Sequence, residues 1–313
     1  MKRYAAIVIS LLAVVGLVTG VSGRIRRGQA MQVRFNKRDL PKHDVHIITS
    51  ADPTFDVTAS AYFKAESGKS NENLKPFSVF VKNSGNRTVV AYMLIWQMVK
   101  TNGQVITNKS SYAEPGMLMG DEMPTDPRFK HTQAIEPNQV RCFSWSAPIN
   151  AEGQGLLGSG DSPSQNVKTN EDLAAAIRSQ LTTELSQATD VTVSLDGIFF
   201  DDGTFVGPDT SGYFEQMQAM VNAKLDLLRQ VATAKENGKE DQAFEAVTAK
   251  SLEPDSTITS ESSPEEYYRY YMKLFAREIH GMKSFYGKQR LVPYLLKLHK
   301  RTHPVLKKIA EER

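Results

Sequence analysis

TVVAYMLIWQMV, residues 88–99, is the segment of this chain that most strongly favours a β-strand. It carries no charge and is dense in β-branched and aromatic side chains, which pack well on a pleated sheet. Thr101-Asn102-Gly103-Gln104 follows, and Asn-Gly between two such runs is the strongest short signal for a hairpin. Residues 105–107 are therefore expected to return as its partner strand, and Trp96 is expected to fill the space between two sheets.

Shorter strands are predicted on both sides of this hairpin. Their signs are alternating apolar and polar side chains, β-branched and aromatic residues, and turn-forming residues at the ends. The segment that begins at Phe55 alternates with a period of two as far as Tyr62-Phe63, and Asp202-Gly203 is typical of a hairpin tip. The predicted strands cover residues 55–63, 77–81, 140–145 and 191–195, and residues 198–206 are predicted to form a second hairpin.

This succession of short strands and turns resembles an immunoglobulin-like or fibronectin-like β-sandwich of exported proteins over about residues 50–208. The resemblance includes a tryptophan on the long central strand, and it implies two antiparallel sheets packed face to face. Immunoglobulin domains pair two cysteines across these sheets, whereas Cys142 is the only cysteine of this chain. The chain departs from the family pattern here, and its stability must come from packing.

Helical periodicity appears twice. Residues 169–188 carry leucine and isoleucine side chains spaced four apart, which predicts a helical insertion in the sandwich. From Tyr213 onward apolar residues recur at steps of three and four, which predicts a helical region over residues 209–313. Within it, Ser263-Pro264-Glu265-Glu266 is a capping box, and we expect the helix that it begins to end at Gly281. The predicted fold class is α+β: an antiparallel β-sandwich (residues 51–208) with a helical insertion, followed by an α-helical part.

The first residues predict where the protein works. Residues 1–23 combine a basic start, a 17-residue run without charge and small residues at its exit, which is the order of a secretory signal peptide. Arg24, Arg26 and Arg27 follow at once, so an uncleaved N-terminal membrane anchor is the alternative. Residues 24–50, with seven Lys and Arg, are expected to form a basic linker. The signal and the single cysteine favour an extracytoplasmic bacterial protein, either periplasmic or secreted.

The net charge of +3 is unevenly spread along the chain. Residues 1–149 hold 19 Lys and Arg against 11 Asp and Glu, residues 150–263 hold 7 against 19, and residues 264–313 hold 12 against 5. Such blocks indicate either docking of the acidic middle on the basic C-terminus or separate partners, with solvated faces as the alternative. The expected partner is a protein or an envelope polymer and not a nucleic acid. A membrane is a further alternative, contacted through the N-terminal segment or the basic C-terminus.

Two groups of side chains are candidate sites. Carboxylate oxygens bind calcium, so four aspartates around the second hairpin form a weak calcium candidate, although their spacing matches no calcium loop. Three tyrosines share one face of the helix after Ser263, whereas Tyr268 points elsewhere. They are candidates for binding a sugar ring or a partner protein, with core packing as the alternative. The two groups are Asp196, Asp201, Asp202 and Asp209, and Tyr267, Tyr270 and Tyr271.

No motif predicts a catalytic, cofactor-binding or firm metal-binding residue. The sequence therefore favours a non-enzymatic binding module of the cell envelope or the secreted fraction, with an unidentified ligand. The alternative is a secreted hydrolase whose catalytic residues converge only in the fold. A deep pocket with convergent polar groups would favour the enzyme, and a shallow surface with exposed aromatic side chains would favour the binding module.

Overall fold

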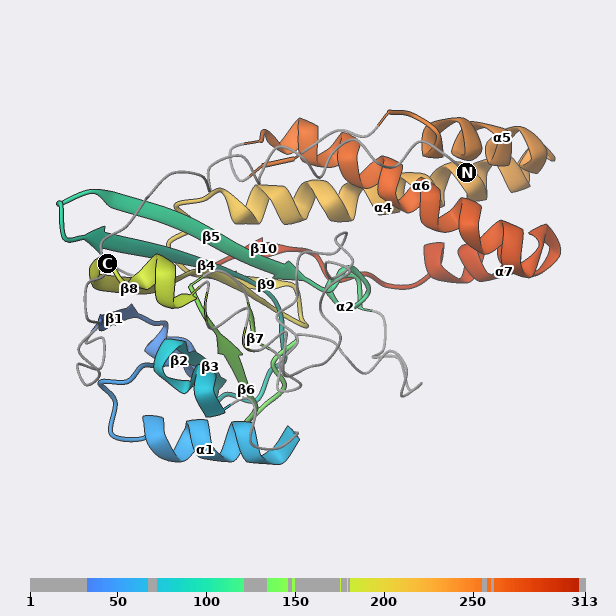
Figure 1. The fold of residues 1–313 in the computed structure, drawn as a ribbon. Coiled ribbons are helices and arrows are strands. Elements are labelled where there is room, and N and C mark those ends of the chain that lie inside the picture. The colour runs from blue at the N-terminus through green and yellow to red at the C-terminus, as the bar shows by residue number, and fades with distance from the viewer. Residues whose placement is uncertain are drawn as a thin grey trace. The chain divides into compact units, whose positions relative to one another are not determined.

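The computed structural model divides the chain into residues 1–32 and residues 33–313, and the described residues belong to the second unit. They are 33–66, 72–120, 134–145, 148–149, 175, 179, 181–254, 258–259 and 262–309. The expected signal peptide and most of the expected helical insertion lie outside them. Within them the fold is α+β, with largely antiparallel sheets and a C-terminal helical part, as predicted (Figure 1).

Two sheets form the β part. The larger sheet has the order β10-β9-β8-β4-β5, with β1 also paired to β8, and the smaller has the order β2-β3-β6-β7. Neighbouring strands are antiparallel except for the pairs β1–β8 and β9–β10. The strands are β1 (Arg34–Arg38), β2 (Val45–Ile48), β3 (Val79–Asn83), β4 (Val89–Lys100), β5 (Val105–Ala113), β6 (Val140–Phe143), β7 (Pro148–Ile149), β8 (Ala188–Phe200), β9 (Thr204–Val206) and β10 (Lys307–Lys308).

The predicted central strand is confirmed as β4, which pairs with β5 on one edge and β8 on the other. Its side chains alternate between two hydrophobic cores. Tyr92, Leu94 and Trp96 belong to one core, whereas Ala91 and Met93 belong to the other. A strand that is covered on both faces needs apolar residues at consecutive positions, which explains the uninterrupted run in the sequence. The predicted hairpin is also confirmed, with Gly103 at a φ of 81°.

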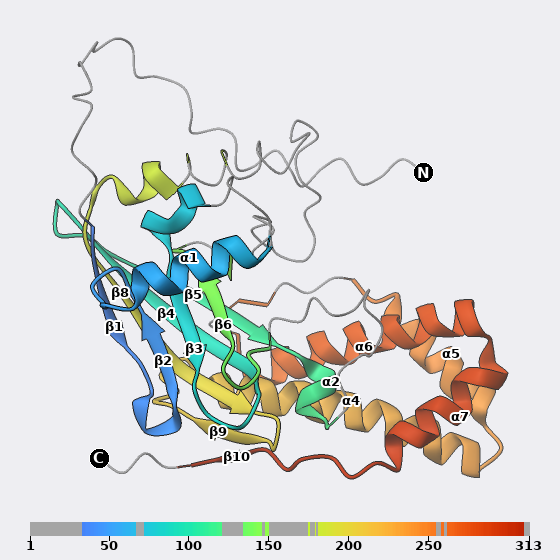
Figure 2. The same ribbon diagram turned by 90° about the horizontal axis from the view of Figure 1, so that it is seen from below.

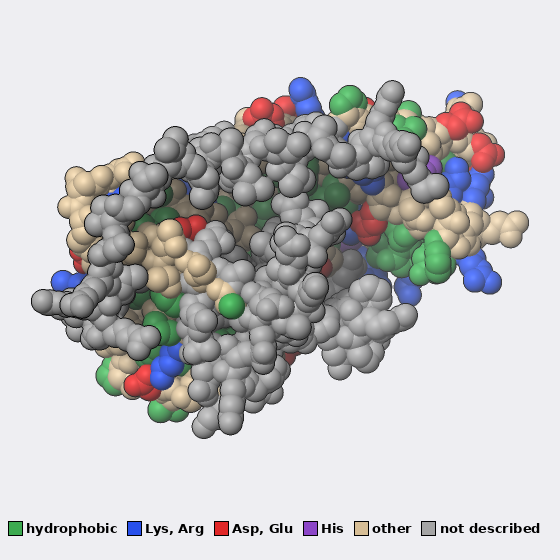
Figure 3. Space-filling view, viewed as in Figure 1, with side chains coloured by type: hydrophobic (Ala, Val, Ile, Leu, Met, Phe, Trp, Pro, Cys, Tyr) green, Lys and Arg blue, Asp and Glu red, His purple; other side chains and the backbone are tan. Residues whose placement is uncertain are grey.

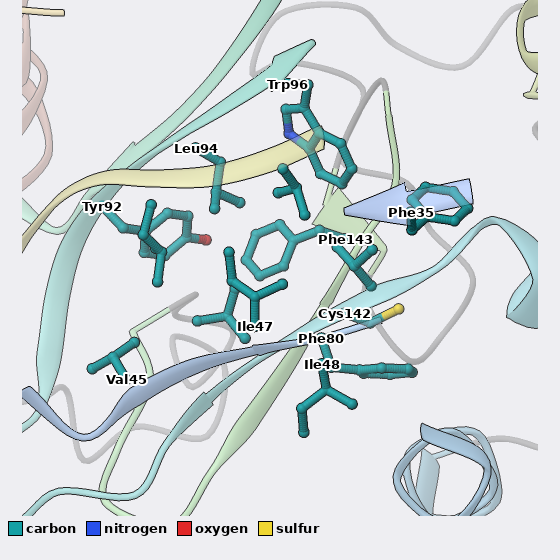
Figure 4. Packing of buried hydrophobic residues seen from close by; sticks show 14 of the residues in the cluster. Phe35, Val45, Ile47, Ile48, Phe80, Tyr92, Leu94, Trp96, Cys142 and Phe143 are labelled. Carbon is teal, nitrogen blue, oxygen red and sulfur yellow. The ribbon is translucent and has the colours of Figure 1, made fainter. Parts of the chain in front are cut away.

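The first core, here called the inter-sheet core, lies between the two sheets and extends to helix α1 (Phe55–Glu66) (Figure 4). Tyr92 on β4 and Phe143 on β6 meet edge to face across the sheets, with ring centroids 5.4 Å apart. On the other side of the smaller sheet, Phe55 and Phe63 of α1 pack on Phe80 of β3. Helix α1 thus covers the outer face of the smaller sheet.

The second core, here called the helix core, joins the outer face of the larger sheet to the C-terminal helices. Phe199 of β8 and Phe205 of β9 pack on Tyr213 and Phe214 at the start of α4. After the last helix the chain returns along the sheet edge and adds β10 beside β9 (Figure 2). The helices are α2 (Pro115–Leu118), α4 (Tyr213–Glu236), α5 (Glu240–Ser251), α6 (Pro264–Tyr286) and α7 (Lys288–His299), and two short 3-10 helices cover Pro41–His43 and Glu72–Phe77.

The acidic and basic blocks of the sequence meet in this helical part. Helices α4 and α5 of the acidic block pack on α6 and α7 of the basic block, mainly through buried apolar side chains. Among the described residues, two ion pairs link the blocks: Lys288 with the exposed Asp241, and Lys308 with Asp209, whose side chain is buried. An exposed ion pair contributes little, roughly 0–1 kcal/mol, so the Lys288 pair adds little beside the buried apolar faces.

The strand predicted for residues 55–63 is wrong, because these residues form the helix α1. The buried side chains are Phe55, Ala59 and Phe63, spaced four apart, whereas Val57 is 74% exposed. The apparent alternation is therefore the buried stripe of a helix. Apolar residues spaced four apart also fit a period of two, so a segment of nine residues does not distinguish the two patterns.

Part of the expected basic linker also has regular structure. Residues 34–38 and 45–48 form β1 and β2, one in each sheet. Their apolar residues Phe35, Val45 and Ile47 are buried in the inter-sheet core, while the basic residues of β1 remain largely exposed. A high content of Lys and Arg does not exclude a strand here, because edge strands tolerate charged side chains on their solvent face.

The capping box at Ser263 is confirmed with both reciprocal hydrogen bonds, but the predicted end of that helix is wrong. Helix α6 continues through Gly281 to Tyr286 and stops at Gly287, whose φ of 75° favours glycine. The buried stripe explains the continuation, since Met272, Phe275 and Ile279 hold the helix on α4 through this turn. A glycine in a helix interior costs stability without breaking the helix.

Gly281→Ala is accordingly expected to raise the free energy of unfolding by about 0.5–1 kcal/mol, because alanine is the better helix former. A Cβ added at this position meets no atom within 4 Å. Urea unfolding followed by circular dichroism measures the change. Gly238→Ala, at a φ of 64° between α4 and α5, is the control and should lower stability. Destabilisation by Gly281→Ala would show that the helix ends there after all.

Candidate functional site

A cleft of about 570 Å³ lies on the outer face of the larger sheet, beyond the start of α4. Its floor is made by side chains of β4, β5 and β8, among them Gln97, Thr107 and Ser194. The connection between β1 and β2 forms one wall and residues 208–210 form another. The cleft exists because α4 covers only part of this sheet face, which leaves the polar positions of β4 and β5 uncovered.

The wall between β1 and β2 is a short, well-anchored turn. Leu40 and Val45 are buried and pair with each other through backbone hydrogen bonds of 3.1 and 3.4 Å. The 3-10 turn Pro41–His43 lies between them, and Asp44 closes it in the left-handed conformation at a φ of 59°. Arg38 precedes this anchor and Lys42 lies within the turn, and both are exposed at the cleft.

The charges that line the cleft are unbalanced. Arg38, Lys42 and Lys109 bring three cations to it, and its two carboxylates belong to Asp39 and Asp196. Asp39 lies 4.0 Å from Lys37 Nζ and 3.9 Å from His46 Nδ1, outside the cleft. The carboxylate of Asp196 is buried and fully engaged with backbone and hydroxyl donors. Among the described residues that line the cleft, cationic side chains thus outnumber carboxylates by three to two.

Asp196 holds the entrance to the helical part against the sheet. One carboxylate oxygen accepts hydrogen bonds from the backbone and hydroxyl of Thr210, and the other accepts the same pair from Ser211. The Asp196 backbone oxygen also accepts a hydrogen bond of 2.8 Å from the Asp209 backbone. A buried carboxylate satisfied in this way is a positioning group for the segment that leads into α4.

The other three calcium candidates have separate surroundings. Asp209 accepts hydrogen bonds from the Phe214 backbone and from Lys308, and Asp202 binds Arg87 and the Thr204 backbone, whereas Asp201 is exposed. Burial opposes ionisation of Asp202, but the hydrogen bonds from Thr204 and Arg87 outweigh it and hold the pKa of the carboxyl below its usual value. Among the described residues, no group of three or more His, Cys, Asp or Glu could hold a metal ion.

The three tyrosine candidates lie on the inner side of α6. Tyr267 is buried and donates a hydrogen bond of 3.1 Å to the Thr259 carbonyl, and Tyr271 stacks between Tyr267 and Phe275. Tyr270 is half-buried and meets Tyr271 edge to face. Tyr268 makes a separate contact, because its hydroxyl donates a hydrogen bond of 2.9 Å to Asp226 of α4. This arrangement favours the packing alternative for the tyrosines.

The buried groups with strongly raised pKa values belong to the two cores. Burial raises the pKa of the Cys142 thiol to about 12, and burial also raises the pKa of Tyr213 well above its usual value. Neither side chain lines the cleft. Both groups are thus inert packing residues, because a thiol or phenol with a raised pKa stays protonated and is a poor nucleophile.

Sequence reasoning did not identify Arg38, Lys42 and Lys109 as residues of one site. The only signal was the density of Lys and Arg in residues 24–50, which was interpreted as a linker. Comparison with protein families, characterised proteins and solved structures finds no match to this chain. In the described part of the chain, no helix is both long enough and apolar enough to cross a membrane.

Proposed function

We propose that this protein is a non-enzymatic binding module of the cell envelope or the secreted fraction, and that the cleft beside β1 binds an anionic ligand. One observation carries the proposal: Arg38, Lys42 and Lys109 come from two separate segments and line the same cleft, while its buried carboxylate is occupied by structural hydrogen bonds. Phosphate and carboxylate groups are the ligands that such cations recognise.

The shape of the cleft supports a polymer or a flexible ligand. Its floor is a sheet surface that offers hydroxyl and amide groups, from Thr107, Ser194 and Gln97. These groups can pair with the hydroxyls or amides of a chain that lies along the strands. The long side chains of Arg38 and Lys42 are exposed, so they can follow anionic groups at more than one position. An acidic envelope polymer fits this combination better than a small, rigid substrate.

The hydrolase alternative would have to use residues of the same cleft. Ser194, His43 and Asp39 all line it, and they are the residue types of a hydrolytic triad. However, no hydrogen bond joins them within the described part of the chain, and Asp39 faces Lys37 and His46 instead. A serine without a base in hydrogen-bond reach is not activated, so binding is the function that this geometry supports.

The proposal includes the immunoglobulin-like arrangement and the extracytoplasmic location. Two largely antiparallel sheets that share one core support the sandwich, and the order of residues 1–23 supports export. In sandwich proteins the end loops and sheet edges are common binding surfaces. The β1–β2 connection, which supplies Arg38 and Lys42, is a loop of this kind.

The cleft is tested with Arg38→Gln/Lys109→Gln, which removes two charges and keeps polar, unbranched side chains. Binding of inorganic polyphosphate and of polygalacturonate, measured by calorimetry, should weaken at least about tenfold for whichever polymer carries the matching anion. The control is Arg290→Gln/Lys297→Gln, an equal loss of charge on α7. Equal weakening by both variants would show unspecific attraction and contradict the proposal. Ester hydrolysis that Ser194→Ala abolishes would establish the hydrolase instead.

A further inference from the structure

The end of the helical part where α6 meets α7 carries aromatic side chains on its surface. Phe285 is 82% exposed and Tyr286 is 55% exposed, and their rings pack edge to face with centroids 4.8 Å apart. Tyr294, two turns into α7, is 49% exposed. A single exposed aromatic residue is ordinary, but three within ten positions at one end of the helices form a patch that indicates an interaction surface.

Along the chain, the charges that follow Ile279 have one sign, although Glu278 lies near Tyr294 and Asp241 pairs with Lys288. From Ile279 to Ala310 the chain holds eight Lys and Arg and no Asp or Glu. Lys288 is paired with Asp241 of α5, whereas Arg290 and Lys297 form no ion pair with any carboxylate of the described residues. At this end of the helical part, Figure 3 shows Lys and Arg side chains with hydrophobic side chains beside them, and some Asp and Glu side chains nearby.

Helix α7 is amphipathic, with a buried apolar face and an exposed face. Leu291, Val292, Leu295 and Leu298 are buried in the helix core. Arg290, Tyr294 and Lys297 follow each other at steps of four and three, so they share one face beside the buried stripe, and all three are exposed. Phe285 and Tyr286 end the preceding helix immediately before the turn at Gly287, so the aromatic pair adjoins the first turn of this cationic face.

We propose that this surface, residues 283–297, docks on the anionic surface of a lipid bilayer. Phe285 and Tyr286 would enter the headgroup region, where aromatic side chains are favoured, while Arg290 and Lys297 would contact lipid phosphates. The charge supports a bilayer rather than a protein, since an anionic membrane presents one sign over its whole surface and requires no shaped pocket. This docking is independent of the ligand proposed for the cleft.

The structure also explains why such docking needs no change of fold. The apolar face of α7 is already covered by α4 and α6, so only the exposed tip has to enter the interface. Amphipathic surface helices bind with their apolar face buried about 5–10 Å below the lipid phosphates. A pair of rings at a helix end reaches less deeply, so the expected binding is reversible and depends on salt.

A local probe tests the proposal in the full-length protein. Phe285→Trp places an indole at the tip, and vesicles of phosphatidylcholine mixed with brominated phosphatidylglycerol quench tryptophan fluorescence at the interface. We expect quenching of this added tryptophan with these vesicles and its loss with brominated phosphatidylcholine alone or in high salt. Val57→Trp, at an exposed position on α1, is the control and should not be quenched. Because the probe reports one position, attachment through residues 1–23 cannot produce this difference.

The charge requirement is tested in the same vesicles by partitioning. Each Lys or Arg near an anionic surface is worth about a fivefold change in partition, so Arg290→Gln/Lys297→Gln should weaken it on the order of twentyfold. Arg34→Gln/Lys100→Gln, an equal loss of charge on β1 and β4 outside the cleft, should leave it within about twofold. Equal effects of the two pairs, or absence of quenching at position 285, would overturn the proposal. If position 285 is not quenched, the aromatic patch is a docking site for a protein, and the proposal for the cleft is unaffected.

Discussion

Trp96→Ala is expected to lower the free energy of unfolding by about 3–5 kcal/mol, the usual cost of emptying a large aromatic site in a core. Trp96 is fully buried on β4 and lies in the inter-sheet core with Leu94 and Phe143 (Figure 4). β4 pairs on both edges and cannot move toward the smaller sheet to close the space. The cavity would therefore remain, and urea unfolding followed by circular dichroism should show a clearly lower midpoint.

Trp96→Phe is the matched control, because it keeps an aromatic ring and removes the indole N–H. The Trp96 Nε1 atom is buried and has no hydrogen-bond partner within the described residues. An unpaired buried donor costs about 1–3 kcal/mol, so its removal offsets part of the lost packing. We expect the phenylalanine variant to be much closer to the parent protein than the alanine variant. Equal losses would mean that the space between the sheets is not filled by the ring.

Gly207→Ala is expected to destabilise the protein by about 3–5 kcal/mol, from backbone strain and overpacking together. Gly207 has a φ of 125°, which side-chain-bearing residues rarely adopt. An added Cβ would lie 2.7 Å from the Asp196 backbone oxygen and 2.8 Å from the Gly197 Cα. Both atoms belong to the backbone of β8, so relief requires a shift of the strand rather than of a flexible side chain.

The position of Gly207 links this loss to the proposed site. The residue follows β9 and precedes the segment that Asp196 holds against β8, which forms one wall of the cleft. Gly103→Ala is the control for strain alone, since its φ is 81° and an added Cβ there meets nothing within 4 Å. That variant should cost about 1–2 kcal/mol. If thermal unfolding shows the two variants to be equally destabilised, the close approach at Gly207 has no energetic consequence.

Local chemistry was sufficient for much of the secondary structure. The β-branched run at 88–99, the Asn102-Gly103 and Asp202-Gly203 turns and the capping box at Ser263 each lie where the sequence predicts them. These features depend on propensity and on hydrogen bonds between residues close in the chain. All the interacting residues therefore lie within one short segment of the sequence. The same holds for the helices after Tyr213, whose apolar stripes are long enough to define their period.

Short or polar elements could not be predicted in this way. The stripe of Phe55, Ala59 and Phe63 is compatible with either period, and only the available face of the smaller sheet decides that it is a helix. β1 and β10 are basic segments that become strands because β8 and β9 offer them unpaired edges. Likewise Gly281 is a plausible helix end by composition, but packing on α4 carries the helix past it.

The sequence by itself determined that this protein is an α+β chain with a strong central hairpin, a helical C-terminal part and an uneven charge. Only the tertiary structure decided which of those charges act together. Arg38 and Lys109 are 71 positions apart and meet because β1 and β5 flank the same face of the larger sheet. Asp196 and Asp209, two of the four calcium candidates, instead fix the entrance to α4. Such sites depend on contacts between distant segments, and no local pattern records those contacts.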